Sequence, residues 1–262
     1  MMNDNESKEQ AYHFNGSYTK ENLDEILKEL GKEFRKLNGN KMPAEIILVG
    51  GAAVVAGYGF RDRTSDIDAF IQASSAMNMA ITRVAEKYDM PKDWMNQDFR
   101  KTDSYSPEIV LHSTPYKTFS NVMHVRTLPS AYIVAMKLAS LRPYKYDFSD
   151  VIGIIKESGI EKKAVIDAVS DLYGGFDHLA KKDAARKLLD EIYESNDLEE
   201  LYLRYRDDEV ENFKILKGIN DDYPELLNTD NVENILSAAR KKLAAQKKDT
   251  GDPAQPSLPK SP

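Results

Sequence analysis

The stretch IILVGGAAVVAGYGFRDRTSDIDAFI, residues 46–71, carries the strongest pattern in this 262-residue chain. An apolar run ends on Gly50 and Gly51, and Asp66 and Asp68 follow on either side of a single isoleucine. AEIILV predicts a buried strand, the two glycines a turn, AAVVAGY a short helix and DIDAFI a second strand. The expected order is therefore strand, glycine turn, helix and strand.

The two aspartates indicate a metal site. Side chains two residues apart on a strand point to the same face, so Asp66 and Asp68 present carboxylates about 7 Å apart at the backbone. Ionised carboxylates at this spacing repel each other, and a divalent cation with oxygen ligands, Mg²⁺ or Mn²⁺, would offset the repulsion. Gly50 and Gly51 let the chain turn tightly and leave backbone N–H groups open to a phosphate. Metal and phosphate together indicate nucleotide chemistry.

Neither half of this pattern is specific alone. Paired glycines after an apolar run are most often a plain turn, and Asp-x-Asp is most often a solvated loop. The interval between the halves lets a short helix return the chain beside the first strand, and this makes the combination specific. Other glycine motifs are excluded, because Gly57 and Gly59 would need a third glycine where Asp62 stands, and no Gly-Lys-Ser/Thr sequence occurs.

The composition is that of a folded protein without a membrane span. Apolar residues make up 41% of the chain and charged residues 30%, and no apolar run approaches the roughly 18 residues that a bilayer requires. The polar N-terminus lacks the features of a signal peptide and there is no cysteine, so we expect a cytoplasmic protein without thiolate metal sites. The net charge of −7 argues against nucleic acid binding over the whole surface, although a local basic groove is compatible with it.

A change of pattern divides the chain into two parts. Residues 17–158 mix helical and extended patterns and predict an α/β domain, whereas residues 159–246 predict an all-helical appendage. The polar ends, residues 1–16 and 247–262, are predicted to be disordered. The expected helices cover residues 19–37, 75–88, 91–100, 129–141, 162–172, 181–193, 198–216 and 232–245, and further strands are expected at EIVLH (108–112) and NVMHVRTL (121–128).

Residues 49–71 resemble the signature of the polymerase-β-like nucleotidyltransferases, in which Gly-Gly or Gly-Ser precedes an Asp-x-Asp flanked by apolar residues. Two later stretches, PKDWMNQDFRK and PSAYIVAMKLASLRPYKYDFSDVIGII, resemble a bacterial subgroup of nucleotidyltransferase-like proteins, the DUF6036 group. They are also similar to the wider AbiEii-type toxins, in which a helix lysine is followed by an arginine and an Asp-x-x-Asp. The resemblance covers about residues 44–158 and does not extend to the C-terminal helices.

This resemblance implies a mixed sheet flanked by helices and a site that uses an NTP. The implied ligands of Mg²⁺ or Mn²⁺ are Asp66 and Asp68. The residues implied to contact the nucleotide are Gly50, Gly51, Arg63, Thr64 and Ser65. Lys137 would neutralise charge on the phosphates from its helix, with Asp147 and Asp150 closing the site.

Some of these assignments have a plain structural alternative. Lys137 lies in the apolar stretch YIVAMKLASL, where a lysine is either solvated or faces a polar cavity. Arg142 is interpreted as an ion-pair partner of Asp147 or Asp150 rather than as a catalytic residue. Active members of the superfamily carry a third carboxylate on a neighbouring strand, and here either Glu108 or Asp147 would have to supply it.

We therefore predict a metal-dependent nucleotidyltransferase that moves a nucleoside monophosphate from an NTP to an RNA, a protein or a small molecule. One alternative is a non-catalytic nucleotide-binding protein, or a regulatory component of a toxin–antitoxin pair that acts through a partner protein. Another is a helical interaction module formed by residues 160–246. A compact triad of Asp66, Asp68 and one further acid would favour the enzyme.

Overall fold

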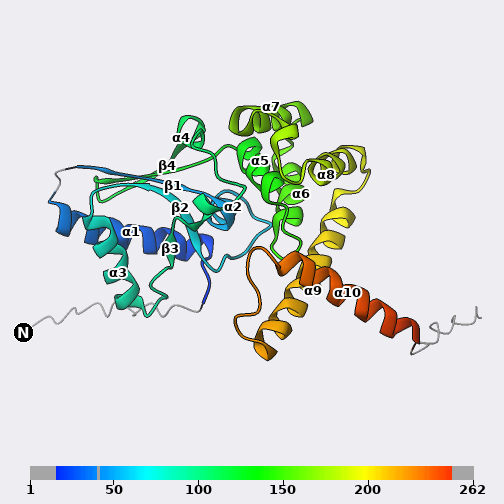
Figure 1. The fold of residues 1–262 in the computed structure, drawn as a ribbon. Coiled ribbons are helices and arrows are strands. Elements are labelled where there is room, and N and C mark those ends of the chain that lie inside the picture. Colours follow the sequence, from blue (N-terminus) through cyan, green and yellow to red (C-terminus); the bar gives the residue numbers. More distant parts are fainter. Residues whose placement is uncertain (1–15, 40–41, 250–262) are drawn as a thin grey trace, which may run out of the picture.

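The structure is a computed structural model that describes residues 16–39 and 42–249. In these residues a mixed sheet is flanked by helices and followed by a helical C-terminal region, which confirms the expected fold class (Figure 1). The strands are β1 (Ala44–Leu48), β2 (Ile67–Gln72), β3 (Met95–Asn96), β4 (Thr114–Phe119) and β5 (Met123–Thr127). The helices are α1 (Lys20–Asn38), α2 (Gly50–Gly57), α3 (Ala76–Tyr88), α4 (Ile109–His112), α5 (Ser130–Ser140), α6 (Asp147–Ser158), α7 (Lys162–Tyr173), α8 (Lys182–Glu194), α9 (Leu198–Asp222) and α10 (Val232–Asp249), with short 3-10 helices η1 (Asp98–Lys101) and η2 (Phe176–His178).

The sheet has the strand order β3-β2-β1-β5-β4. Strand β1 runs antiparallel to β2 and parallel to β5, β2 runs parallel to β3, and β4 forms an antiparallel pair with β5. Leu48, the last residue of β1, lies opposite Ala69 near the start of β2. Because the pair is antiparallel, the glycine turn after β1 lies beside the Asp-x-Asp at the start of β2.

Helices α1 and α3 pack against each other and lie along one face of the sheet (Figure 1). Helix α1 begins as predicted at Thr19, whose side chain accepts a hydrogen bond from the N–H of Asn22, while Asn22 Oδ1 accepts one from the N–H of Thr19 at 2.8 Å. It ends at Gly39, which has a φ of 61°. Its apolar stripe is fully buried at Leu23 and Phe34, so this helix closes the core.

The C-terminal helices α7 to α10 pack against the rest of the chain mainly through contacts with α5 and α6. Helix α5 contacts α6 and α7, helix α6 contacts α9, and α9 contacts α10. The ribbon shows α9 passing close to α6 and α10 extending away from the sheet (Figure 1). Helix α6 therefore lies between α5 and the long helix α9.

Several predicted elements differ from the observed ones. The expected strand at residues 108–112 is wrong, because this stretch forms the short helix α4. Pro107 favours the start of a helix, and Ser106 Oγ accepts a hydrogen bond from the N–H of Glu108 at 3.3 Å. Residues 91–100, expected to be helical, hold strand β3 and part of η1 instead. Neither strand β4 nor helix α6 was predicted as an element.

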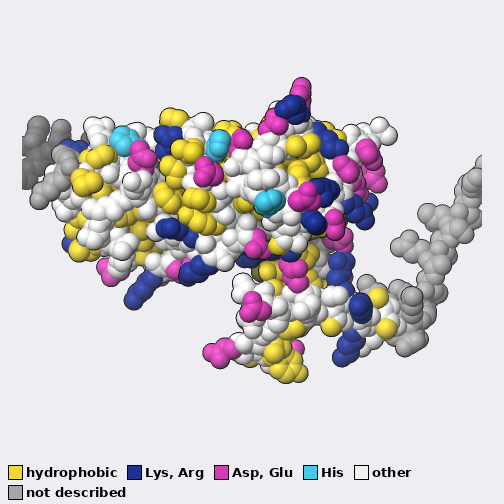
Figure 2. Space-filling model, turned by 45° about the horizontal axis from the view of Figure 1, so that its top comes forward, with side chains coloured by type: hydrophobic (Ala, Val, Ile, Leu, Met, Phe, Trp, Pro, Cys, Tyr) yellow, Lys and Arg dark blue, Asp and Glu magenta, His cyan; other side chains and the backbone are white. Residues whose placement is uncertain are grey.

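The predicted disordered ends lie largely outside the described residues, and helix α10 continues to Asp249, past the expected limit at residue 246. In the described part of the chain, no helix combines the length and apolar character that crossing a bilayer requires. Figure 2 shows acidic and basic side chains intermixed over the face in view.

Candidate active site

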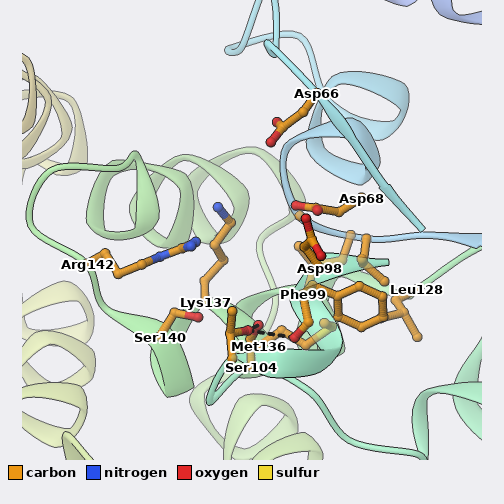
Figure 3. A pocket seen from close by; sticks show the side chains of 14 residues that line it. Asp66, Asp68, Asp98, Phe99, Ser104, Leu128, Met136, Lys137, Ser140 and Arg142 are labelled. Carbon is orange, nitrogen blue, oxygen red and sulfur yellow. Dashed lines mark hydrogen bonds between the residues drawn. The ribbon is translucent and has the colours of Figure 1, made fainter. Parts of the chain in front are cut away.

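A cavity of about 180 Å³ lies where the glycine turn after β1, the start of β2 and helix α5 meet. The acids Asp66, Asp68 and Asp98 line one side of it, and Lys137 and Arg142 line the other (Figure 3). The remaining wall comes from Val49, Gly50, Phe99, Thr102, Ser104, Leu128, Ile133, Met136 and Ser140. The structure thus brings carboxylates and cations from distant parts of the chain to opposite sides of one cavity.

The paired carboxylates lie at the start of β2, where both line the cavity while Ile67 between them is fully buried. Partial burial and the neighbouring charge of Asp66 raise the pKa of Asp68 to about 6, although Arg142 and Lys137 lower it. A carboxylate in this position therefore gains from a cation placed beside it.

Glycine is required at positions 50 and 51 because a Cβ at either position would lie too close to neighbouring side chains. Gly50 has a φ of 57°, and a Cβ at this position would lie 3.0 Å from Asp68 Oδ2. A Cβ at Gly51 would lie 2.3 Å from Thr64 Oγ1 and 2.9 Å from an Arg61 nitrogen. Gly50 lines the cavity, whereas the space beside Gly51 is filled by the chain's own side chains.

Lys137 belongs to a buried ion network behind the cavity. Its side chain is 8% exposed, and its Nζ lies 2.8 Å from Asp147 Oδ1 and 2.9 Å from Asp150 Oδ2. Arg142 donates to Asp147 Oδ2 from Nε at 2.8 Å and from its backbone N–H at 3.0 Å, and Arg61 pairs with Asp150. Three cations and two carboxylates give the network a net charge of +1.

Both kinds of ion in this network are held in their charged forms. Burial alone would lower the pKa of the Lys137 ammonium, but the carboxylates of Asp147 and Asp150 outweigh it and raise the pKa. Burial alone would raise the pKa of Asp147, but Lys137 and Arg142 hold it well below its usual range. The network is therefore a fixed positive group facing Asp66 and Asp68 rather than a mobile lysine side chain.

The other candidate residues lie beside the cavity or apart from it. Arg63 and Ser65 are exposed and Thr64 is buried, and none of them lines the cavity. Asp147 and Asp150 reach it only through Lys137 and Arg142. Glu108 lies at the start of α4 and is not part of the lining.

Two residues near the site were not singled out from the sequence. Asp98, in η1, lines the cavity near Asp68 (Figure 3) and also pairs with Lys101 at 2.7 Å. Arg61 has a side chain that is 9% exposed, and its Nε donates to the carbonyl of Arg63 at 3.1 Å. Asp98 lies inside PKDWMNQDFRK, so this stretch contained its signal, whereas nothing local distinguishes Arg61 from Arg63.

The carboxylates fit Mg²⁺ or Mn²⁺ as ligands shared with a substrate. Among the described residues, no three His, Cys, Asp or Glu side chains lie close enough together to hold a metal ion. Mg²⁺ commonly binds through one or two carboxylates and completes its shell with water and substrate phosphates. Asp66 and Asp68 supply carboxylate oxygens for this arrangement, and burial and mutual repulsion disfavour the charged form of Asp68 in spite of the neighbouring cations, so that a metal ion would stabilise it.

A larger hollow of about 750 Å³ adjoins the cavity. The two share Thr102, Ser140 and Arg142 in their linings. The far wall of the hollow comes from the segment between α9 and α10 and the start of α10, including Asn228, Thr229, Asp230, Glu233 and Asn234. The cavity therefore continues into a space bounded by the C-terminal helices.

A family model described as a nucleotidyltransferase of unknown function (DUF6036) matches residues 25–210. The match covers well over half of the chain and includes α5 to α8 and part of α9, beyond the stretch whose resemblance was evident from the motifs. No curated protein and no solved structure matches the chain.

Proposed function

The chain belongs to the DUF6036 family of nucleotidyltransferases, and we propose that it moves a nucleoside monophosphate from an NTP to an acceptor in a metal-dependent reaction. The observation that carries this proposal is that Asp66 and Asp68 face Lys137 and Arg142 across one cavity. Such an arrangement binds a cation on one side and phosphate oxygens on the other. The acceptor is an RNA, a protein or a small molecule that carries a hydroxyl group.

In the proposed mechanism Asp66 and Asp68 hold Mg²⁺ or Mn²⁺, which when bound supplies the charge that activates the acceptor hydroxyl and stabilises the leaving pyrophosphate. Gly50 leaves room for the Asp68 carboxylate at the edge of the cavity, since a Cβ there would lie 3.0 Å from Asp68 Oδ2. The buried ion network that includes Lys137 has a net positive charge. This charge attracts the phosphates and offsets the negative charge that develops on them. Arg142 is the guanidinium of this network that lines the cavity.

The size of the cavity bears on where the substrates lie. At about 180 Å³ it is smaller than the roughly 300 Å³ at the low end for ligand pockets. A complete NTP and an acceptor must therefore extend into the adjoining hollow. We assign the phosphates and metal to the cavity, and the base or the acceptor to the space bounded by the α9–α10 segment.

A second candidate function is nucleotide binding without catalysis, in a protein that acts through a partner, for instance in a toxin–antitoxin pair. The absence of a three-carboxylate metal site among the described residues favours this alternative. The two functions differ in one observable, which is whether labelled nucleotide becomes attached to an acceptor.

The experiment compares the wild-type chain with the double variant Asp66→Asn/Asp68→Asn and with Asp62→Asn, an exposed acid in the same loop. Calorimetry measures the binding of each NTP with Mg²⁺, and α-labelled NTPs with total RNA and cell protein detect transfer. We expect the double variant to lose metal-dependent binding and Asp62→Asn to keep it. We also expect Asp68→Asn to raise the melting temperature in metal-free buffer, because it removes a partly buried charge repelled by Asp66.

Unchanged NTP binding by the double variant would rule out the assignment of the metal ligands. Binding that depends on the two aspartates, without labelled product from any acceptor fraction, would favour the non-catalytic alternative. Binding and transfer that both disappear in the double variant would support the enzyme.

A further inference from the structure

Helix α9 contacts the turn between α5 and α6 through several side chains. Asn212 donates from Nδ2 to the carbonyl of Pro143 at 2.7 Å, and the guanidinium of Arg206 lies 3.6 Å from the centre of the Tyr146 ring. Tyr205 stacks on Phe148 with ring centres 5.4 Å apart and an interplanar angle of 9°. The α5–α6 turn is thus braced by a helix that lies outside the α/β part of the chain.

Glu209 makes the most specific of these contacts. Its Oε1 accepts a hydrogen bond from the N–H of Phe148 at 2.8 Å, and its Oε2 accepts from Ser149 Oγ at 2.5 Å and from the N–H of Ser149 at 3.4 Å. Tyr146, at the N-cap of α6, makes no side-chain capping bond. Glu209 therefore caps α6 from a different helix, in place of a local Ser, Thr, Asp or Asn.

The capped turn carries the acids of the buried network. Asp147 and Asp150 both lie in the first turn of α6, and both are fully or almost fully buried. Both form ion pairs with Lys137, and Asp147 also forms one with Arg142. A displacement of this turn would therefore move the cations that line the cavity opposite Asp66 and Asp68.

The free-energy cost of burying two polar side chains of α9 indicates that they do more than fill space in the core. Glu209 and Asn212 are each only 2% exposed, and an apolar residue at either position would bury its surface without the cost of desolvating a polar group. Both polar side chains are directed at the same turn. Their shared target is the segment that sets the positions of Asp147 and Asp150.

We propose that Glu209 is a positioning residue of the active site, which caps α6 and thereby holds Asp147, Asp150 and Lys137 in place against the cavity. This role rests on the proposed nucleotidyl transfer, since it gives the network the task of binding phosphates. It also assigns a function to α9, which braces the site and does not serve only as an appendage.

The test uses Glu209→Ala, which removes the cap, and Glu209→Gln, which keeps an oxygen for the N–H of Phe148. Glu211→Gln changes an exposed acid on the same helix and is the matched control. Hydrogen exchange measures the protection of the Phe148 and Ser149 amides. The NMR signal of the Lys137 ammonium, assigned by its absence in Lys137→Met, reports whether the network has moved, and calorimetry measures Mg²⁺–ATP binding.

We expect Glu209→Ala to speed exchange at both amides roughly tenfold, to shift or broaden the Lys137 signal and to weaken Mg²⁺–ATP binding several-fold. Glu209→Gln should recover most of each property, and Glu211→Gln should match the wild type. Faster exchange with an unchanged Lys137 signal and unchanged affinity would overturn the proposal, because Glu209 would then stabilise only the helix end.

Two further outcomes are also decisive. If Glu209→Ala fails to fold, Ser149→Ala removes a single bond of the cap and should shift the Lys137 signal in the same direction by a smaller amount; no shift would overturn the proposal. If the wild-type chain binds no nucleotide, the proposed function fails by itself. The Lys137 signal then still decides whether Glu209 positions the network.

Discussion

Two variants, Lys137→Met and Asp150→Asn, test whether the buried network carries the excess of one positive charge that the structure indicates. Lys137→Met removes one of three cations and leaves each carboxylate with a guanidinium partner, Arg142 or Arg61. Asp150→Asn removes one of two carboxylates and leaves three cations with Asp147 alone. The two changes, made at opposite ends of one ion pair of 2.9 Å, should therefore differ in cost.

The magnitudes follow from the contacts. Lys137 makes a charge-assisted hydrogen bond to Asp147, worth about 1.5–3 kcal/mol, and an ion pair with Asp150 at 2.9 Å. Methionine loses both but avoids burying an ammonium and keeps most of the side-chain volume, so we expect a net loss of about 1–2 kcal/mol. Asparagine at 150 leaves uncompensated buried cations, and for this variant we expect a loss of about 3–4 kcal/mol.

Urea unfolding in metal-free buffer at neutral pH measures both values as changes in the free energy of unfolding. Lys163→Met is the control, because its side chain is 79% exposed and its pair with Asp167 lies on the surface, where such pairs contribute about 0.5 kcal/mol or less. If Lys137→Met lowers the free energy of unfolding by as much as Asp150→Asn does, or by more, the net positive charge assigned to the network is refuted.

Two other predictions concern Gly51 and Glu209. Gly51→Ala places a methyl group 2.3 Å from Thr64 Oγ1, so we expect urea unfolding to show a loss of about 2 kcal/mol that Thr64→Ala partly restores; undiminished stability with lost NTP binding would instead assign the glycine to the ligand. Burial and neighbouring acids raise the pKa of Glu209 to about 8 from an ordinary value of 4.5. The stability that this carboxyl contributes is thus complete below pH 4.5 and is lost as the pH rises through about 8. Across this pH range the stability of Glu209→Gln should rise relative to that of the wild type by about 4–5 kcal/mol, at about 1.4 kcal/mol per pH unit, and parallel pH profiles of the two chains would contradict the raised pKa.

Local sequence was sufficient for the elements whose pattern repeats along the chain. The helical spacing of α1, its cap at Thr19 and its stop at Gly39 depend on neighbouring residues, and these features were predicted correctly. The order of β1, glycine turn, α2 and β2 also followed from local periodicity. The stretch at residues 108–112 was ambiguous because a short apolar run fits either a strand or a helix, and here the preceding Ser-Pro favoured the helix.

In the site, too, some features follow from local sequence and others only from tertiary packing. The sequence by itself determined that Asp66 and Asp68 share a face, because alternation along a strand is a local property. Only the tertiary structure decided which charges meet them: Arg61 pairs with Asp150 across 89 positions of the chain, and Glu209 caps a helix that begins 62 residues before it. Such contacts have no sequence period, since packing of separate elements brings their side chains together and low solvent exposure makes the pairing of charges obligatory.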